Sequence, residues 1–357
     1  MRNLIAIIGF MLLQACSSSS SSEEVELEGN SPSNNNPTSS VVYNWSIPIS
    51  EVFDGGPGKD GIPALVNPEF DNVQNITYLS DDDLVIGIKS GDDVRAYPHA
   101  ILDWHEIIND NLEGVSVALT YCPLTGTGIG WSRMIEGKET TFGVSGLLYN
   151  TNLIPYDRAT GSNWSQILNE SVYGELQGEK PDLIQLFETD WKTWKILYPN
   201  SRVVSINTGF SRTYGTSPYG NYNTNDDIFL FPVNVDSRLP SKERVHAILN
   251  GEDAKVYRFS DFGSNNIIRD TFKDREYLIV GNSDFILSFE LTGEQIMLDF
   301  EYVYDGSEVI IRDEEGSEWN IFGEAISGSR TRQILANSNS LMGMWFSIPA
   351  FYNTELY

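Results

Sequence analysis

The chain has 357 residues, of which 40% are hydrophobic and 12% aromatic, which is enough for two packed domains. Its formal net charge of −27 at pH 7 argues against a nucleic acid partner, because phosphate groups would repel such a surface. An acidic surface mainly keeps a protein soluble, so the charge alone indicates no substrate.

The N-terminus has the pattern of a secretion signal. Arg2 gives it a positive start, and residues 4–13 form an apolar run that is too short to span a bilayer. The run ends in L-Q-A-C, which resembles the lipobox of bacterial lipoproteins. We therefore predict a signal peptide over residues 1–15 and a lipid on Cys16 as the new N-terminus.

The residues that follow the lipid site are predicted to form a tether. Residues 16–40 are dominated by Ser, Glu, Asn and Pro, a composition typical of disordered segments. Signal, lipid and tether together predict a protein of the bacterial cell envelope. Its partner there would be a membrane, held through the N-terminal lipid on the periplasmic or the cell-surface side of the outer membrane.

The body of the chain is predicted to be α+β and mainly antiparallel β. Alternating or β-branched runs indicate short strands, and they lie at residues 85–88, 94–97, 115–121, 128–134 and 140–144. A helix is predicted over residues 98–108, with Pro98 in its first turn. A second helix is predicted to end at Tyr198, with Thr189 or Asp190 as its N-cap.

The second half of the chain repeats segments of the first half at a nearly constant spacing. The matching pairs keep their order along the chain, and they are residues 91–97 with 251–257, residues 107–110 with 267–270, and Trp164 with Trp319. Ordered matches of this kind are the signature of an internal repeat. The sequence therefore predicts a tandem duplication of one domain.

The duplication divides the body into three parts. A first repeat covers residues 41–200 and a second, supporting repeat covers residues 241–357. The connection between them, residues 201–240, is rich in Tyr and Gly and too aromatic for a plain linker. It could lie over a site as a lid or pack across the seam between the repeats, and we expect packing.

Comparison of the two repeats places the candidate site in the first. His105 and Glu106 fall opposite two asparagines, and Cys122 falls opposite Asn282. Cys122 is also the one cysteine expected to keep a free thiol once Cys16 carries lipid. Residues that only one copy has are better candidates for chemistry than the shared scaffold. We therefore assign the candidate site to Cys122, His105 and Glu106.

A loop that is longer in the first repeat suggests where a substrate would bind. The extra length lies near residues 146–152, in a stretch dense in polar and aromatic side chains. The candidates for contact with a substrate are Tyr149, Asn150, Asn152, Arg158 and Gln166. Arg158 is also expected to form an ion pair with Asp157 that fixes the loop. His99 and His246 are interpreted as incidental.

Three functions remain open at this point. Thiolate and imidazole select soft transition metals, so Cys122 and His105 could bind copper, with further ligands from Glu106 or its neighbours. Alternatively, Cys122 is the nucleophile of an enzyme, with His105 as base and Glu106 orienting it. Both require the sulfur and the imidazole to lie within roughly 8 Å of each other. The third possibility is a surface binding module whose Tyr- and Asn-rich loop contacts a glycan or a peptide.

Several longer motifs resemble a known family. They are H-E-I-I-N-D, T-Y-C-P-L-T-G-T-G, F-G-V-S-G-L-L-Y-N-T-N, Y-D-R-A-T-G-S-N-W-S-Q, L-P-S-K-E-R-V and M-W-F-S-I-P-A-F-Y-N-T-E-L-Y. Over residues 61–357 the chain is similar to the bacterial and archaeal domain-of-unknown-function family 3179. The resemblance implies no established activity. Many members carry C-P-L-C, which would imply a redox pair or a soft-metal site, and Thr125 replaces the second cysteine here.

Overall fold

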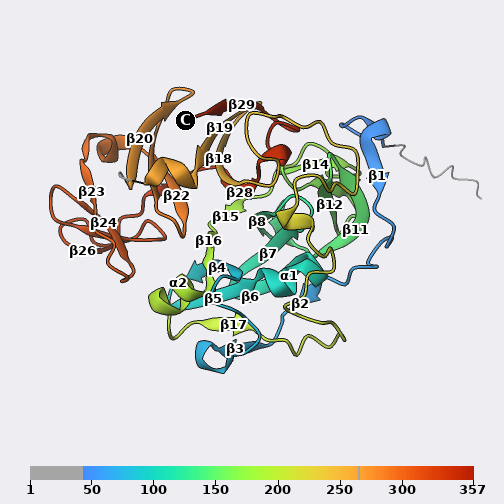
Figure 1. The fold of residues 1–357 in the computed structure, drawn as a ribbon, viewed down its shortest axis with the longest axis horizontal. Helices are drawn as coiled ribbons and strands as arrows, with labels where there is room; N and C mark the ends of the chain where they lie inside the picture. The colour runs from blue at the N-terminus through green and yellow to red at the C-terminus, as the bar shows by residue number, and fades with distance from the viewer. Residues whose placement is uncertain (1–42, 264–265) are drawn as a thin grey trace, which may run out of the picture. The chain divides into compact units, whose positions relative to one another are not determined.

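Antiparallel β-sheet dominates the part of the chain that the computed structural model describes, residues 43–263 and 266–357 (Figure 1). The predicted signal peptide, the tether and the lipid site at Cys16 lie outside these residues. Within the described ranges, no helix has the length and apolar character needed to cross a bilayer. The predicted fold class, mainly antiparallel β with few helices, is confirmed.

A sheet of the same strand arrangement occurs in each half of the chain. The first is β16-β4-β5-β17-β3, made of Phe187–Asp190, Leu84–Ser90, Asp93–Pro98, Arg202–Val204 and Phe70–Asn72. The second is β28-β18-β19-β29, made of Ser340–Met344, Arg244–Asn250, Asp253–Arg258 and Asn353–Leu356. In both, the central hairpin is antiparallel and the strand beyond it is parallel. The register also agrees, because Ile86 lies opposite Tyr97 as His246 lies opposite Tyr257.

A second pair of sheets has matching order as well. In the first half it is β15-β8-β7-β6-β2, made of Leu183–Ile184, Thr127–Ser132, Val115–Cys122, Ile107–Leu112 and Leu65–Val66. In the second half it is β27-β22-β21-β20, made of Ala336–Asn337, Ile286–Leu291, Arg275–Gly281 and Ile267–Phe272. Ile107 lies opposite Thr120, and Ile267 lies opposite Val280. Cys122 is therefore the last residue of a central strand.

The third pair of sheets shares a feature that we call the Trp–Asp corner, in which a buried tryptophan indole donates to an aspartate at the end of the preceding strand. Its strands are β1-β11-β12-β13-β14 (Val52–Asp54, Phe142–Tyr149, Asn152–Asp157, Asn163–Ser165, Glu170–Tyr173) and β23-β24-β25-β26 (Phe300–Tyr302, Val309–Asp313, Glu318–Asn320, Ala325–Ser327). A small hairpin, β9 (Met134–Ile135) and β10 (Lys138–Glu139), stands apart. The buried Trp164 indole donates to Asp157 Oδ2 at 3.2 Å, and the Trp319 indole donates to Asp313 Oδ2 at 3.0 Å.

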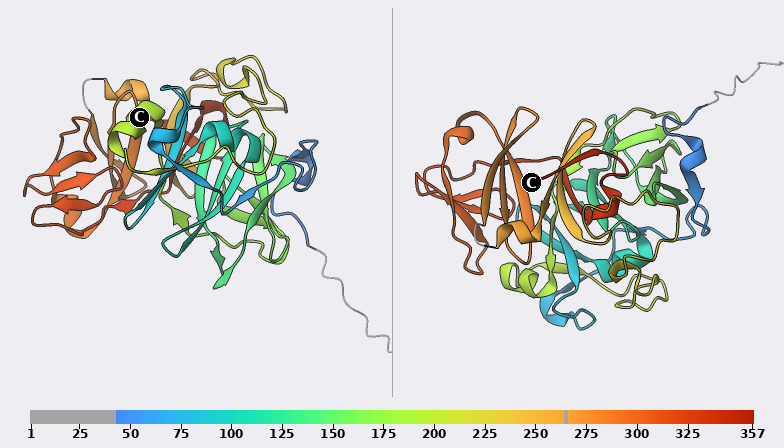
Figure 2. Two further views of the ribbon diagram at one scale, coloured as in Figure 1. Left: turned by 90° about the horizontal axis from the view of Figure 1, so that it is seen from below. Right: turned by 45° about the horizontal axis from the view of Figure 1, so that its top comes forward.

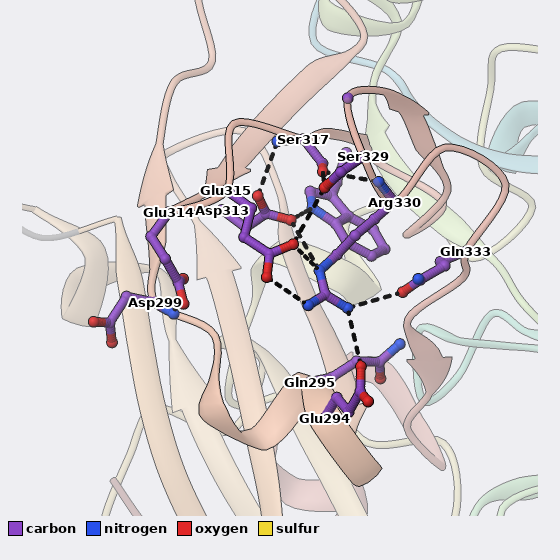
Figure 3. A network of polar contacts seen from close by, with 12 residues as sticks. Glu294, Gln295, Asp299, Asp313, Glu314, Glu315, Ser317, Ser329, Arg330 and Gln333 are labelled. Atoms are coloured by element: carbon purple, nitrogen blue, oxygen red, sulfur yellow. Dashed lines mark hydrogen bonds and ion pairs between the residues drawn. The ribbon is translucent and has the colours of Figure 1, made fainter.

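An arginine network braces the second of these corners (Figure 3). The guanidinium of Arg330 forms two parallel bonds of 2.9 Å with the carboxylate of Glu315, the geometry in which arginine recognises a carboxylate best. The Arg330 backbone N–H also donates to Ser317 Oγ at 3.2 Å. The loop before β27 is thereby fixed to the β24–β25 turn that holds Asp313.

Among the described residues the structure has two α-helices, each of seven residues. Helix α2 (Trp191–Leu197) is capped by Asp190, one of the two caps that the sequence left open. Asp190 Oδ1 accepts from the Thr193 backbone N–H at 2.7 Å, and the helix ends one residue before the predicted Tyr198. Helix α1 (His99–His105) ends earlier than predicted, because Glu106 turns out of the helix and β6 follows at once. The corresponding places in the second half hold 3-10 turns, Phe259–Phe262 and Trp345–Ser347.

Two large apolar cores each combine both halves of the chain. In one, Trp131 and Phe142 of the first half pack with Val245 and Val256 of the second. In the other, Val85, Phe187 and Trp194 pack with residues such as Leu278, Phe289 and Trp319. Figure 2 shows the yellow and gold strands of the second half beside the green and teal strands of the first. In both cores, strands of one half thus pack against strands of the other half. Residues Tyr43–Tyr357 accordingly form one compact unit.

Candidate functional site

Glu106 occupies an unusual backbone position between α1 and β6. Its φ is +56° and its ψ is −33°, whereas its N–H still bonds to the Leu102 carbonyl at 2.8 Å. Positive φ at the end of a helix is normally left to Gly or Asn, because a Cβ is crowded there. Strained backbone at a residue with a titratable side chain is typical of functional sites. The turn aims Glu106 away from the helix and into the protein.

The Glu106 carboxyl is buried and weakly hydrogen-bonded. The residue is 7% exposed, and the Tyr219 hydroxyl donates to its Oε1 at 3.4 Å. Burial raises the pKa of Glu106 to about 8, with a smaller opposing effect from Tyr219. One helical turn earlier, burial raises the pKa of Asp103 to about 6, and its buried Oδ1 has no hydrogen-bond partner among the described residues. At neutral pH Glu106 is therefore mostly a neutral acid.

Cys122 is buried beside this carboxyl as an unreactive thiol. It is 1% exposed, and its Sγ lies 3.7 Å from the Thr151 carbonyl oxygen. Burial, with the nearby Glu106 as the next cause, raises the pKa of Cys122 to about 11. Because the thiolate is the nucleophile and the metal ligand, a raised pKa disfavours both functions. The environment of Cys122 is that of a small core residue.

His105 is engaged elsewhere. Its Nδ1 donates to the Pro63 carbonyl oxygen at 2.8 Å, and its Nε2 lies 2.7 Å from the Tyr214 hydroxyl. The ring is fully buried, and burial lowers its pKa, so the imidazole is neutral and Nε2 accepts from Tyr214. Within the part of the chain that the structure describes, no hydrogen bond joins His105 to Cys122, and no three His, Cys, Asp or Glu residues form a group that could hold a metal.

The connection between the halves covers this region. Tyr214 and Tyr219 bond to His105 and Glu106, and the Trp104 indole donates to the Thr216 carbonyl at 3.2 Å. These contacts all fall on α1 and the residue after it. The segment therefore packs against α1 and contacts Glu106.

A buried lysine holds the same segment in place. The Lys242 Nζ lies 3.0 Å from the centroid of the Tyr222 ring, and the Lys242 backbone N–H donates to Asp226 Oδ1 at 2.6 Å. The Tyr222 hydroxyl in turn donates to the Leu124 carbonyl at 3.0 Å, two residues after Cys122. The covering segment is thereby attached both to the second half of the chain and to the β7–β8 turn.

Glu106 lines a pocket of about 160 Å³. Its walls are aliphatic and aromatic, and its polar side chains are those of Glu106 and Tyr219. One wall is the segment around Gly146, where a Cβ would lie 2.8 Å from the backbone of Gly58, so glycine lets the two loops approach. The stretch that makes the first half longer therefore does line a pocket. The arrangement can bury an apolar molecule and offer it one neutral carboxyl.

Comparison with known families agrees with the motifs. A family model described as "Protein of unknown function (DUF3179)" matches residues 59–355. The chain belongs to this DUF3179 family. No curated protein and no solved structure matches the chain. The family resemblance deduced from the motifs is thus confirmed, and the family's description assigns no activity.

Two of the predicted substrate contacts of this DUF3179 protein instead meet the C-terminal segment. Tyr149 packs edge-on against Phe351 with ring centroids 5.4 Å apart. Asn150, at a φ of +47°, donates from Nδ2 to the Ala350 carbonyl at 2.8 Å. Both residues join the two halves of the chain, and neither lines the pocket at Glu106.

The predicted ion pair between Arg158 and Asp157 is wrong. Arg158 Nη2 bonds to Asp60 Oδ1 at 2.7 Å, and Nη1 donates to the Phe142 carbonyl at 2.9 Å. Asp157 instead accepts from the Thr160 backbone N–H and from Trp164. Asp157 is the last residue of β12 and is fully buried, whereas Arg158 lies in the turn that follows and is exposed, so the two side chains find different partners.

Asn152 and Gln166 belong to a buried polar network. They are 1% and 0% exposed, and Asn152 Nδ2 donates to Gln166 Oε1 at 2.7 Å. Gln166 Nε2 donates to Thr120 Oγ1 and to the Thr127 carbonyl, both at 3.1 Å, and Thr127 donates back to Gln166 Oε1 at 2.8 Å. A network that satisfies its own members in this way supports the fold and leaves little for a ligand.

Sequence reasoning placed Glu106 in the site but missed Asp103 and Tyr219. Asp103 stands in the same D-W-H-E stretch, three residues before Glu106, and side chains at this spacing lie close together at a helix end, which is a usable signal. Tyr219 gives no such signal. It comes from a loop without periodicity, and only the fold brings it to a residue more than a hundred positions earlier.

Proposed function

We propose that this DUF3179 protein is a binding module that takes a small, mainly apolar molecule with one polar group into the pocket at Glu106. The observation that carries the proposal is a neutral, buried carboxyl that lines a pocket whose other walls are apolar except for Tyr219. Ligand sites usually combine apolar walls with a few placed polar groups. A protonated carboxyl can both donate and accept, so it fits a carbonyl, hydroxyl or amide on the ligand.

The other hypotheses receive less support from the geometry. Copper binding and a cysteine nucleophile both need a thiolate beside a free imidazole, whereas Cys122 is a thiol and both nitrogens of His105 are engaged. A glycan would need several polar contacts, and the pocket offers two polar side chains. A carboxyl that titrates near neutral pH suits general acid catalysis, which makes proton transfer by Glu106 the second candidate.

The binding proposal predicts a specific response to changes at Glu106. With n-hexanol and hexanamide as probes, calorimetric titration of the wild type is expected to show saturable binding. Glu106→Gln is expected to keep the affinity within about threefold, because an amide still donates and accepts. Glu106→Leu is expected to weaken it about tenfold, the worth of one hydrogen bond. Glu252→Leu, at an exposed position, is the control. Equal affinity in wild type and Glu106→Leu would contradict the proposal.

We further propose that the protein is a lipoprotein of the bacterial cell envelope, anchored through Cys16. The L-Q-A-C motif after a short apolar run supports this placement. Replacement of Cys16 by Ala is expected to move the protein from the membrane fraction to the soluble fraction or to block its maturation. Membrane fractionation of the two forms checks the anchor, and an unchanged distribution speaks against it.

We also propose that the body is a tandem duplication. The matching strand orders and registers of the three sheet pairs support it, as do the two Trp–Asp corners. A superposition of residues 83–199 on residues 245–353 in an experimental structure should align Tyr97 with Tyr257 and Trp164 with Trp319 at once. A superposition that aligns only one of these pairs would refute common descent of the halves.

A further inference from the structure

A second cavity, of about 80 Å³, lies where the two halves of the chain meet. From the first half it is lined by β4, β8 and the stretch from β15 to β16 (Figure 1). From the second half it is lined by the strands at the matching places, β18, β22 and the stretch from β27 to β28. The cavity is therefore framed by equivalent strands, one set from each half.

The lining of this seam cavity differs between the halves at positions that the registers make equivalent. For example, Ile279 and Leu119 occupy equivalent positions on β21 and β7. Ser288 pairs with Ile279 and Gly130 pairs with Leu119, so Ser288 and Gly130 are equivalent as well. Four polar residues of the second half stand where the first half has glycine or aliphatic residues, and the pairs are His246 and Ile86, Ser288 and Gly130, Ser338 and Ile184, Ser340 and Leu186. The glycine and aliphatic residues of the first half are enough for packing, so packing alone does not explain why the second half has polar residues at these four positions.

The four polar residues form one hydrogen-bonded row that ends in an unpaired nitrogen. His246 Nε2 lies 2.6 Å from Ser288 Oγ, and Ser288 Oγ lies 2.5 Å from Ser338 Oγ. Ser338 Oγ lies 2.9 Å from Ser340 Oγ. His246 is 4% exposed, and its buried Nδ1 has no hydrogen-bond partner within the described ranges. A buried polar atom is rarely left unpaired, because its lost hydration costs about 1–3 kcal/mol.

The charges around the seam cavity are already paired. Glu188 lines it, and its carboxylate bonds to Arg244 and lies 3.2 Å from His99 Nε2. Burial alone would raise the pKa of Glu188, but Arg244 and His99 outweigh it and hold the pKa low. Burial lowers the pKa of His246 to about 4, so its imidazole is neutral. A charged ligand would find no free opposite charge in this cavity, so the lining favours an uncharged ligand.

The seam cavity is also within reach of solvent. Two of its lining residues reach the surface, since Leu183 is 38% exposed and the equivalent Asn337 is also exposed. Two others, His246 and Ser288, are buried, at 4% and 7% exposed. A cavity lined by both exposed residues and buried polar residues has what a small-molecule site needs, which is access from solvent and polar groups that fix orientation.

We propose that the seam cavity binds a small uncharged molecule carrying an amide or hydroxyl group, which hydrogen-bonds to His246 Nδ1 and to the serine row. This site shares no residue with the pocket at Glu106 and does not depend on the function proposed for it. The second half, expected from its sequence to be a supporting copy, thereby contributes the hydrogen-bonded serine row and His246 to this site.

The test follows the three histidines of the full-length chain by ¹⁵N NMR. Titration with acetamide, and separately with propane-1,2-diol, is expected to shift the His246 Nδ1 signal saturably while His105 stays unchanged. The variants Ser338→Ile and Ser340→Leu install the residues of the first half. Each is expected to weaken the apparent affinity at least about tenfold, as loss of a buried hydrogen bond does.

A matched control replaces an apolar residue of the opposite wall. Ile184→Val is expected to leave the apparent affinity within about threefold, since no hydrogen bond is lost. If one serine variant fails to fold, as an altered His105 signal would reveal, the other still decides the result. A shift that rises linearly without saturation would mean that the probes do not bind in the cavity. A saturable shift that both serine variants retain would mean that the serine row takes no part in binding. Either result would overturn the proposal.

Discussion

Replacing Glu106 by glutamine is expected to stabilise the protein at pH 8.5 by roughly 3–5 kcal/mol relative to the wild type, and to change little at pH 4.5. In the folded protein burial holds the pKa of Glu106 at about 8, against an ordinary value near 4.5. Each pKa unit corresponds to about 1.4 kcal/mol of preference for the protonated form. Glutamine keeps the shape of the neutral acid and cannot ionise.

The sign of this pH dependence follows from where the proton is held. Below pH 4.5 both the folded and the unfolded chain hold the proton, and the contribution of Glu106 is fully present. As the pH rises toward 8 the unfolded chain releases the proton first, so wild-type stability is lost across this window. Urea unfolding of wild type, Glu106→Gln and Glu252→Gln at pH 4.5, 6.5 and 8.5 measures the effect. A constant difference between wild type and Glu106→Gln would show that the buried carboxyl is not protonated.

The second large effect is expected at the Trp–Asp corner. Asp157→Ala should lower the free energy of unfolding by about 3 kcal/mol, because it leaves several buried donors without an acceptor. Asp157 is fully buried and accepts from the Thr160 backbone N–H at 2.8 Å, from the Thr160 hydroxyl at 2.8 Å and from the Trp164 indole at 3.2 Å. Thr160→Val, which removes one of these donors, is expected to cost about 1 kcal/mol.

The second half offers a matched variant for this corner. Asp313 is 3% exposed and accepts from the Trp319 indole at 3.0 Å and from the Ser317 backbone N–H at 2.8 Å. Asp313→Ala should therefore destabilise the protein to within about 1 kcal/mol of Asp157→Ala. Denaturant unfolding at pH 7 compares the two, and a loss below about 1 kcal/mol in both would show that the corner is dispensable.

The sequence predicted features that depend on neighbours along the chain. The hairpin strands, the Asp190 cap and the repeated Trp164 and Trp319 all follow from local patterns, and the structure has each of them. It did not predict the end of α1, because nothing in the residue type of Glu106 announces a positive φ.

The candidate site was predictable only in part, for a related reason. Glu106 and Cys122 could be singled out because the second half lacks them. Their surroundings come from residues far away in the chain, such as Tyr219 and Tyr214, and no sequence period links these to α1. Asn152 and Gln166 were expected to contact a substrate because polar side chains usually lie at a surface. In the fold both are buried and bond to each other.

The cores that combine both halves have a consequence for how the protein is made. Val85 and Trp194 emerge from the ribosome early, yet their packing partners Leu278 and Phe289 are synthesised near the end of the chain. Until then the early strands have no apolar cover, so the growing chain depends on holding factors longer than one built from independent domains. The same shared packing limits what the chain can lose. Deleting either half would leave strands of the other half without the apolar residues that now cover them.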